Sequence, residues 1–362
     1  MDNRFLYQEI SQKILKRIEA DALKEGDIIP TEKELSELYG VSRNTIRNAV
    51  QLLVDGGRLK KIRGYGTVIT NKLPKTSIGL IVPDIINTFF TRITRGVEDV
   101  AVQQGCSVIL CNSDNNTEKE RKYLDELKDS VLGFIVAPAT GNQNYAHYGE
   151  LIQKQIPFVF IDRYLPEFNV GYVTCDNERG GYLATKYLLE RGHRRIAIIE
   201  ELDATSIRER ERGYRKALVE SGLAVDERLI IKTNKTNAEG GYDGIGRLLK
   251  AKLLITAVFC SNDFVAKGVY TYLNEHGIKI PDEISVVGFD DDVEIATLLN
   301  PPLTTVMQPN YKIGVHAAQM LIGAIKKNEK VLTEEVMQVT FVERASVSNL
   351  RSDHSQDDLL AK

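Results

Sequence analysis

The sequence predicts an α/β protein in which a small helical head precedes a larger module of two α/β subdomains. Residues 1–70 contain three helix patterns followed by a short basic hairpin. From Ser77 onward, short runs rich in Val and Ile alternate with amphipathic stretches. Residues 71–76 are polar, contain proline and lack periodicity, so we place the linker there. The large module should span residues 77–350, followed by a polar C-terminal tail at 351–362.

Composition indicates a cytosolic globular protein. The chain has 362 residues, enough for two or three domains, and is 43% hydrophobic and 27% charged. No apolar run reaches the ~18 residues that a membrane span needs, and the N-terminus has no apolar signal core. The cysteines are scattered without CxxC spacing, so we expect neither a metal site nor a disulfide framework. They are Cys106, Cys111, Cys175 and Cys260.

The head begins with an amphipathic helix and continues with a capped second helix. Apolar residues at helical spacing in the first helix are Tyr7, Ile10, Ile14 and Ile18. Thr31 is a suitable N-cap, and Glu34 three residues later completes a capping box. Leu35 and Leu38 should form the buried stripe of the second helix. Gly40 should end it.

The third helix presents the residues expected to read DNA. Ser42 should cap it, and Ile46, Val50 and Leu53 form its apolar stripe. The same helical wheel directs a polar set towards solvent or DNA: Arg43, Asn44, Thr45, Arg47 and Asn48. Long donors and short polar groups at the start of a helix suit base-edge recognition in the major groove. The alternative is an ordinary solvated helix face.

A local basic surplus supports DNA binding. Residues 41–72 hold seven Lys or Arg and one acid, whereas the chain as a whole has a net charge of −3. Residues 58–63 form a basic strand, residues 64–66 a turn, and residues 67–69 a return strand. Because the Gly-x-Gly leads into a strand rather than a helix, it predicts a wing and not a nucleotide loop.

Residues 1–70 resemble the HutC-like winged helix-turn-helix of the GntR family. The matching signature is Gly26-Asp27, Pro30-Thr31-Glu32, Leu35, Val41-Ser42-Arg43, Thr45-Ile46-Arg47, Leu53 and Gly64-x-Gly66-Thr67-x-Ile69. The resemblance implies that the domain binds double-stranded operator DNA. Together with Asn44 from the helical wheel, the candidate contacts are Lys33, Ser42, Arg43, Asn44, Thr45, Arg47, Arg63 and Gly64.

The large module should contain parallel sheets that bind a ligand between them. Seven apolar runs predict strands: residues 77–83, 106–112, 132–138, 156–162, 195–200, 256–262 and 284–290. Amphipathic stretches predict helices at residues 91–104, 117–130, 178–191, 208–222 and 263–276. This alternation is typical of parallel sheets covered on both faces, and two such sets predict two subdomains with a cleft. Ligands of parallel sheets bind at the carboxyl ends of the strands.

Residues that follow the predicted strands suit a sugar. They are Asp84, Asn87, Phe89, Phe90, Asp162, Arg163, Ser206, Arg208, Arg210, Asn262, Asp263, Asp290, Asp291 and Gln308. Carboxylates, amides and a guanidinium can bind vicinal hydroxyls, and an aromatic face can stack on a sugar ring. Individually, an Asp or Asn here could simply cap the next helix, Arg163 could form a supporting ion pair, and the phenylalanines could anchor a loop.

Residues 77 to about 346 resemble the LacI/GalR effector domain, which has the periplasmic-binding-protein-like (type I) fold. Matching segments include Pro83-Asp84-x-x-Asn87-x-Phe89-Phe90, Ile161-Asp162-Arg163, Arg210-x-x-Gly213-Tyr214, Asn262-Asp263 and Val286-Val287-Gly288-Phe289-Asp290-Asp291. The resemblance implies effector contacts from Phe89, Phe90, Asp162, Ser206, Arg210, Asn262, Asp290 and Gln308. Residues 70–76 lack the hinge helix of typical LacI repressors, so that mechanism of release cannot be transferred.

The two resemblances together predict a sugar-responsive transcription regulator. The combination is similar to arabinose-responsive repressors, which implies a monosaccharide effector such as L-arabinose, no cofactor and a homodimer on a palindromic operator. We expect the sugar to weaken DNA binding. A sugar-responsive activator, a sugar-binding transport protein and a sugar-processing enzyme are the alternatives. GxSxG, HExxH and P-loop motifs are missing from the sequence, so we expect no catalytic residues and no enzyme activity.

Overall fold

A computed structural model describes residues 3–21, 23–70, 75–140, 145–200, 204–233, 235 and 237–350. The chain divides into two compact units, the first formed mainly by residues 1–77 and the second by most of the remainder. Residues 71–74 of the predicted linker and the whole predicted tail, 351–362, lie outside the described residues. No helix in the described part of the chain has the length and apolar character to cross a membrane.

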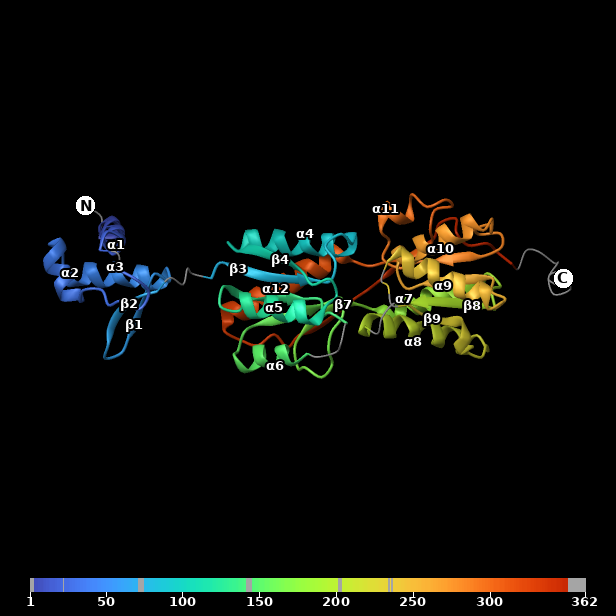
Figure 1. The fold of residues 1–362 in the computed structure, drawn as a ribbon, viewed down its shortest axis with the longest axis horizontal. Helices are drawn as coiled ribbons and strands as arrows, with labels where there is room; N and C mark the ends of the chain where they lie inside the picture. The colour runs from blue at the N-terminus through green and yellow to red at the C-terminus, as the bar shows by residue number, and fades with distance from the viewer. Residues whose placement is uncertain are drawn as a thin grey trace. The chain divides into compact units, whose positions relative to one another are not determined.

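The first unit is a set of helices followed by a β-hairpin (Figure 1). Its elements are α1 (Asn3–Ala20), α2 (Glu32–Tyr39), α3 (Arg43–Asp55), β1 (Leu59–Ile62) and β2 (Gly66–Ile69). The strands pair antiparallel, with Leu59 opposite Ile69 and Ile62 opposite Gly66. Apolar side chains of the helices and the hairpin form one core, which includes Ile10, Ile14, Leu35, Ile46, Val50, Leu53, Leu59 and Ile69. The predicted winged helix-turn-helix is therefore confirmed.

Local hydrogen bonds explain why the second and third helices begin where they do. Thr31 and Glu34 form the predicted capping box at the start of α2. Gly40 ends that helix with φ 63°, a left-handed conformation that glycine adopts without steric cost. Ser42 then accepts the backbone N–H of Thr45 at 3.2 Å and caps α3. The tight turn between α2 and α3 thus follows from short-range chemistry.

One core prediction in the head is wrong. Leu35 is 1% exposed as expected, but Leu38 is 48% exposed. Tyr39, rather than Leu38, packs against the core. Residues four apart lie above one another on a helix, so Leu35 and Tyr39 share the inward face and Leu38 is turned away from it.

The second unit contains two lobes. Among the described residues, the first lobe has a six-stranded sheet with strand order β13-β7-β6-β5-β3-β4. These strands are β3 (Ser77–Val82), β4 (Ser107–Asn112), β5 (Val131–Val136), β6 (Phe158–Ile161), β7 (Tyr172–Cys175) and β13 (Glu334–Met337). Its helices are α4 (Thr88–Gln103), α5 (Thr117–Leu127), α6 (Ala146–Gln153) and α12 (Asn310–Lys327). Helices α4 and α12 pack against each other, although more than two hundred residues separate them (Figure 1).

The second lobe has a smaller parallel sheet with strand order β11-β10-β8-β9 in the described part of the chain. The strands are β8 (Ile196–Glu200), β9 (Ile230–Lys232), β10 (Ala257–Cys260) and β11 (Ser285–Val287). The helices are α7 (Asn177–Glu190), α8 (Thr205–Glu220), η1 (Glu227–Leu229), α9 (Ala238–Lys250), α10 (Asp263–Glu275) and α11 (Val293–Ala296). Strands β12 (Thr305–Met307) and β14 (Thr340–Val342) pair antiparallel beside them.

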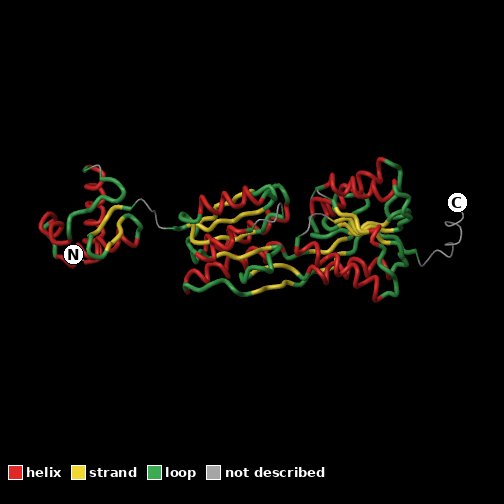
Figure 2. Tube along the Cα trace, turned by 60° about the horizontal axis from the view of Figure 1, so that its bottom comes forward, coloured by secondary structure: helices red, strands yellow, loops and turns green. Residues whose placement is uncertain are grey.

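Strand β8 shows how the smaller sheet is buried on both faces. Ile196 and Ile198 belong to the core cluster that includes residues of α7 and α8. Ala197 and Ile199 belong to the opposite cluster, with residues of α9 and α10. Successive side chains of a strand point to opposite faces, so an uninterrupted apolar run supplies both clusters. Figure 2 shows these strands between layers of helices.

The predicted α/β fold and its two subdomains are confirmed. All seven predicted strands are present, and five further strands, β7, β9, β12, β13 and β14, are found among the described residues of the second unit. Within that description the chain passes between the lobes three times. The passages are at residues 175–177, 307–310 and 337–340. We call residues 174–177, which include the first of these passages, the first crossing.

Candidate functional site

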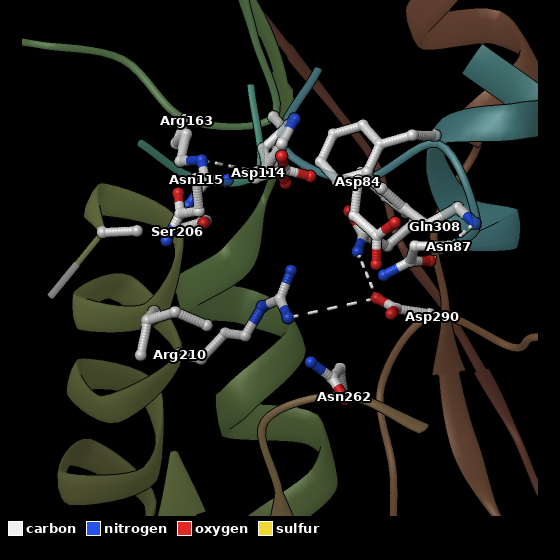
Figure 3. Close-up of a pocket in the computed structure, with 16 residues that line it drawn as sticks. Asp84, Asn87, Asp114, Asn115, Arg163, Ser206, Arg210, Asn262, Asp290 and Gln308 are labelled. Carbon is white, nitrogen blue, oxygen red and sulfur yellow. Dashed lines mark hydrogen bonds and ion pairs between the residues drawn. The ribbon is translucent and has the colours of Figure 1, made fainter. Parts of the chain in front are cut away.

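A cavity of about 300 Å³ lies between the two lobes at the carboxyl ends of their strands (Figure 3). All eight predicted effector-binding residues line it: Phe89, Phe90, Asp162, Ser206, Arg210, Asn262, Asp290 and Gln308. They come from both lobes and from the passage before α12. The placement of these residues follows the strand-end argument, and their contact with an effector stays a prediction.

The first lobe supplies an apolar wall. Phe89 and Phe90 lie in the first turn of α4, and Asn87 caps that helix by accepting the backbone N–H of Phe89 at 2.9 Å. The two rings lie edge to face, with centroids 4.9 Å apart and an interplanar angle of 86°. Such a pair presents one ring face and one ring edge, which suits the apolar C–H face of a sugar.

The second lobe supplies a fixed guanidinium. Arg210 lies on α8, and its side chain is almost fully buried. Its Nε donates to Asn177 Oδ1 at 2.9 Å and its Nη1 donates to the Ser261 carbonyl at 2.6 Å. The Phe289 ring lies 3.7 Å from its Cζ atom. These contacts fix the orientation of the guanidinium beside the cavity.

Asp290 completes a polar cluster around Arg210. Its Oδ1 atom lies 4.0 Å from Arg210 Nη1 and accepts the Gln308 Nε2 hydrogen bond at 2.6 Å (Figure 3). Burial raises the pKa of Asp290 to about 7, although Arg210 and Gln308 favour the ionised form. Burial also raises the pKa of Asp162, against the opposing charges of Arg163 and Arg210. Hydroxyl groups of a ligand would stabilise both carboxylates by donating to them.

Both carboxylates sit on unusual backbone. Asp162 has φ 63° and Asp290 has φ 114°, where most residues with a side chain are strained. Such strain costs on the order of 1–3 kcal/mol and is typical of functional sites. The strained backbone turns each carboxylate at the end of its strand, where both side chains line the cavity.

Two of the residues that follow predicted strands cap the next helix, as the alternative interpretation of these residues proposed, and they line the cavity as well. Asn87 and Asn262 cap α4 and α10, and Asn262 Oδ1 accepts the Val265 N–H at 2.7 Å. Both still line the cavity. Ser206 is 3% exposed and lies in the first turn of α8, whose N-cap residue Ala204 makes no side-chain cap bond.

The effector contacts implied by the family resemblance do not include several lining residues. Among them are Asp84, Asp114, Asn115 and Arg163, which Figure 3 shows on the first-lobe side of the cavity. Asp114 and Asn115 follow β4 in left-handed conformations, with φ 52° and 54°. The strand-end rule identified Asp84 and Arg163, and it applies equally to Asp114 and Asn115 after β4. Among the described residues, no group of His, Cys, Asp and Glu is arranged to hold a metal ion.

Side chains also join the lobes outside the cavity. Thr88, the first residue of α4, donates from Oγ1 to Asp292 Oδ2 in the second lobe. Elsewhere along the lobe boundary, the Tyr164 N–H donates to Thr205 Oγ1 at 3.0 Å, and Tyr164 Oη donates to Glu209 Oε1 at 2.9 Å. Neither Thr88 nor Asp292 lines the cavity. The structure therefore holds the lobes together through contacts that a ligand does not make.

In the first unit, most predicted DNA-binding residues are exposed. They are Lys33, Ser42, Arg43, Asn44, Arg47, Arg63 and Gly64. The expectation that Thr45 faces solvent is wrong, because Thr45 is 8% exposed. Its Oγ1 lies 2.8 Å from Ser42 Oγ, and its N–H donates to the same oxygen, so the cap of α3 draws the side chain inward.

A carboxylate lies within this basic surface. Glu32 is 3.3 Å from Arg47 Nε through one oxygen and 3.3 Å from Lys61 Nζ through the other. It therefore links the recognition helix α3 to the wing. The predicted DNA contacts did not include Glu32, because residues 32, 47 and 61 meet only in the folded unit.

Comparisons with known proteins agree with this architecture. Residues 6–69 match the model for bacterial regulatory proteins of the gntR family, and residues 185–347 match the periplasmic binding protein-like domain. The arabinose metabolism transcriptional repressor of Geobacillus stearothermophilus is 32% identical, over 89% of this chain and 91% of its own. The HTH-type transcriptional repressor PurR of Vibrio atlanticus (strain LGP32) is 37% identical, over 88% and 99% respectively. A crystal structure of a LacI family transcriptional regulator from Enterococcus faecium with bound ribose is 34% identical, with a TM-score of 0.67, covering 76% of this chain and 99% of that one.

Proposed function

Because this chain belongs to the family of bacterial transcriptional repressors that join a GntR-type DNA-binding domain to a periplasmic-binding-protein-like effector domain, we propose that it represses sugar-utilisation genes and that a monosaccharide releases it from its operator. Proteins of this family are transcription regulators and not enzymes. The observation that carries the proposal is the interlobe cavity, where Phe89 and Phe90 face a buried cluster of Arg210, Asp290 and Gln308.

We propose an aldopentose as the effector, with L-arabinose and D-ribose as the leading candidates. The cavity of about 300 Å³ is at the small end of ligand pockets, which favours a single sugar ring. Similar proteins point to these two sugars, since one relative is named for arabinose metabolism and another was solved with ribose. The polar groups of the cavity suffice to bind hydroxyls, and the proposal includes no cofactor.

The effector would act by favouring closure of the lobes. Phe89, Phe90 and Asp162 approach the cavity from the first lobe, and Arg210 and Asp290 approach it from the second. A sugar that contacts both sides stabilises the closed form in proportion to its differential affinity. Sugar and operator then oppose each other through one coupling free energy, typically ~1–3 kcal/mol.

The DNA-bound form would be a cytoplasmic homodimer on a palindromic operator. A twofold axis would present two α3 helices to two half-sites. The edge strand β4 supports self-association, because it ends the larger sheet and Leu110 on it is exposed, as is Val102 on α4. The proposed DNA contacts are the exposed residues Lys33, Ser42, Arg43, Asn44, Arg47, Arg63 and Gly64.

A titration of operator binding tests the proposal. Fluorescence anisotropy of labelled operator DNA would be measured with the full chain and a panel of pentoses and hexoses. We expect an aldopentose to weaken operator binding about 5- to 150-fold, as the coupling range requires. If no sugar in the panel changes operator affinity, the proposal is wrong. Reporter expression with and without the sugar distinguishes a repressor from an activator.

A further inference from the structure

The first crossing, Thr174–Asn177, contacts three cavity-lining residues without lining the cavity itself. Thr174 Oγ1 donates to the Asp162 carbonyl at 2.6 Å. Cys175 Sγ donates to Gln308 Oε1 at 2.9 Å, which joins this crossing to the passage before α12. Asn177 Oδ1 accepts the Arg210 Nε hydrogen bond at 2.9 Å. One short segment therefore reaches cavity residues of both lobes.

Asn177 is itself fixed to the backbone of the crossing. It is 1% exposed, and its Nδ2 donates to the Cys175 carbonyl at 3.1 Å and to Thr174 Oγ1 at 3.3 Å. The same nitrogen lies 3.5 Å from Glu209 Oε2. These donations leave Oδ1 directed at Arg210, so the guanidinium is oriented by a side chain that follows the crossing backbone.

Cys175 orients Gln308 in a similar way. Its thiol donates to the amide oxygen of Gln308, while the amide nitrogen donates to Asp290 Oδ1 at 2.6 Å. An amide held at both ends cannot rotate to exchange its donor and acceptor. Cys175 is 1% exposed, and burial raises its pKa, which keeps the thiol protonated and able to donate.

We propose that Asn177 and Cys175 are positioning residues that tie the ligand-binding geometry of Arg210 and Gln308 to the conformation of the first crossing. When the lobes move, the crossing bends and both anchors move with it, so the two cavity side chains take their binding orientation in the closed form. This inference rests on the proposed sugar-binding function of the cavity. It extends that function to residues that do not touch the effector.

Substitutions at Asn177 separate positioning from simple packing. Asn177→Leu removes the acceptor for Arg210, whereas Asn177→Asp keeps it and loses the two donations to the crossing. Both variants should lower Tm, since each leaves buried polar groups without partners. Thr185→Val is the matched control, because Thr185 is a fully buried residue of α7 whose hydroxyl donates to the Gly181 carbonyl at 2.9 Å, away from the cavity.

Calorimetric titration of the full chain with L-arabinose and with D-ribose gives the decisive readout. We expect Asn177→Leu to raise Kd about 10- to 100-fold, the effect of losing one hydrogen bond to a charged group. Asn177→Asp should stay within about threefold of wild type despite its lower Tm, and Thr185→Val should lower Tm with unchanged Kd. Wild-type Kd in Asn177→Leu, or an equal loss in Asn177→Leu and Asn177→Asp, would overturn the inference.

A second pair of variants covers the case in which Asn177→Leu does not fold. Cys175→Ala should weaken pentose binding about 3- to 10-fold, and Cys175→Ser should restore it, because a hydroxyl can donate to Gln308. Equal affinities of Cys175→Ala and wild type would overturn the inference at this position. If the wild-type chain binds neither pentose, the proposed effector class fails and the inference fails with it. That result can be told apart from one in which the wild type binds a pentose and only the affinities of the variants differ from those expected.

Discussion

Replacing Thr88 by valine should weaken effector binding although Thr88 does not line the cavity. Its hydroxyl donates to Asp292 across the lobe boundary. Asp292 is held in the second lobe by other bonds, since its Oδ1 caps α11 through the Glu294 N–H at 3.0 Å and its own N–H donates to Asp263 Oδ2 at 2.8 Å. We expect this contact to form only when the lobes are closed, so the Thr88→Val change should weaken closure alone.

The magnitude follows from the character of that contact. Asp292 is buried, and a hydrogen bond to a charged group contributes about 1.5–3 kcal/mol. Valine has nearly the shape of threonine, so packing at the start of α4 should be kept. For a pair at the edge of the lobes we take about 1.5–2 kcal/mol from that range. The free energy of lobe closure should become less favourable by that amount, which corresponds to a rise of about 10- to 30-fold in the effector Kd.

Calorimetry with the effective pentose measures this change. Thr91→Val is the matched control, because the Thr91 hydroxyl on the same helix donates, within the described part of the chain, only to carbonyls of its own lobe, those of Asn87 and Ile85. In an Asp292→Ala background, Thr88→Val should have no further effect. An unchanged Kd in Thr88→Val, or a rise no larger than that in Thr91→Val, would refute the reasoning.

Three further predictions concern charge. The pKa of Asp290 is raised to about 7. A sugar that donates to its carboxylate should therefore bind about tenfold more tightly at pH 8 than at pH 6. A Kd that calorimetry finds constant between these pH values would contradict this prediction. Burial and the neighbouring Glu211 raise the pKa of Glu200 to about 8. Because the folded pKa exceeds the unfolded one, Glu200 contributes stability at low pH that is lost as pH rises towards 8. Glu200→Gln should thus raise Tm more at pH 8 than at pH 5, and an equal shift at both pH values in thermal melts would argue against it. Arg47→Ala should weaken operator binding at least about tenfold and leave pentose affinity unchanged, and Asp290→Ala should do the reverse. Anisotropy measures operator binding and calorimetry measures pentose binding for both variants. The assignment of DNA binding to Arg47 and sugar binding to Asp290 is wrong if either folded variant loses both activities.

Many of the cavity-lining residues could be predicted from one rule, that ligands of parallel sheets bind at the carboxyl ends of the strands. Asp162, Asn262 and Asp290 were predicted because each follows an apolar run, and each lines the cavity. Asn115 obeys the same rule after β4 but did not enter the site prediction. The ends of the helices in the first unit could also be predicted from neighbouring residues, since Thr31, Gly40 and Ser42 form the caps expected of them.

Predictions failed where burial depends on partners far away in the chain. Leu38 has the apolar character of a core residue, yet Tyr39 occupies the inward position beside Leu35. Thr45 has the polar character of a surface residue, yet its hydroxyl turns to Ser42 and is buried. Strand β13 was missed because Glu334 and Glu335 make it polar, and its pairing with β7 is what makes it a strand.

The sequence by itself determined the class of each unit and the chemistry of each surface. Helix caps, apolar periodicity and the residues after each strand depend on neighbours within a few positions, and these can be identified in a linear chain. Only the tertiary structure decided how Asn177 orients Arg210, how Cys175 joins two passages between the lobes, and how Thr88 meets Asp292 from 204 residues away. Those contacts form where the described chain passes between the two lobes or where the lobes meet. Their geometry follows from packing, which no local pattern in the sequence records.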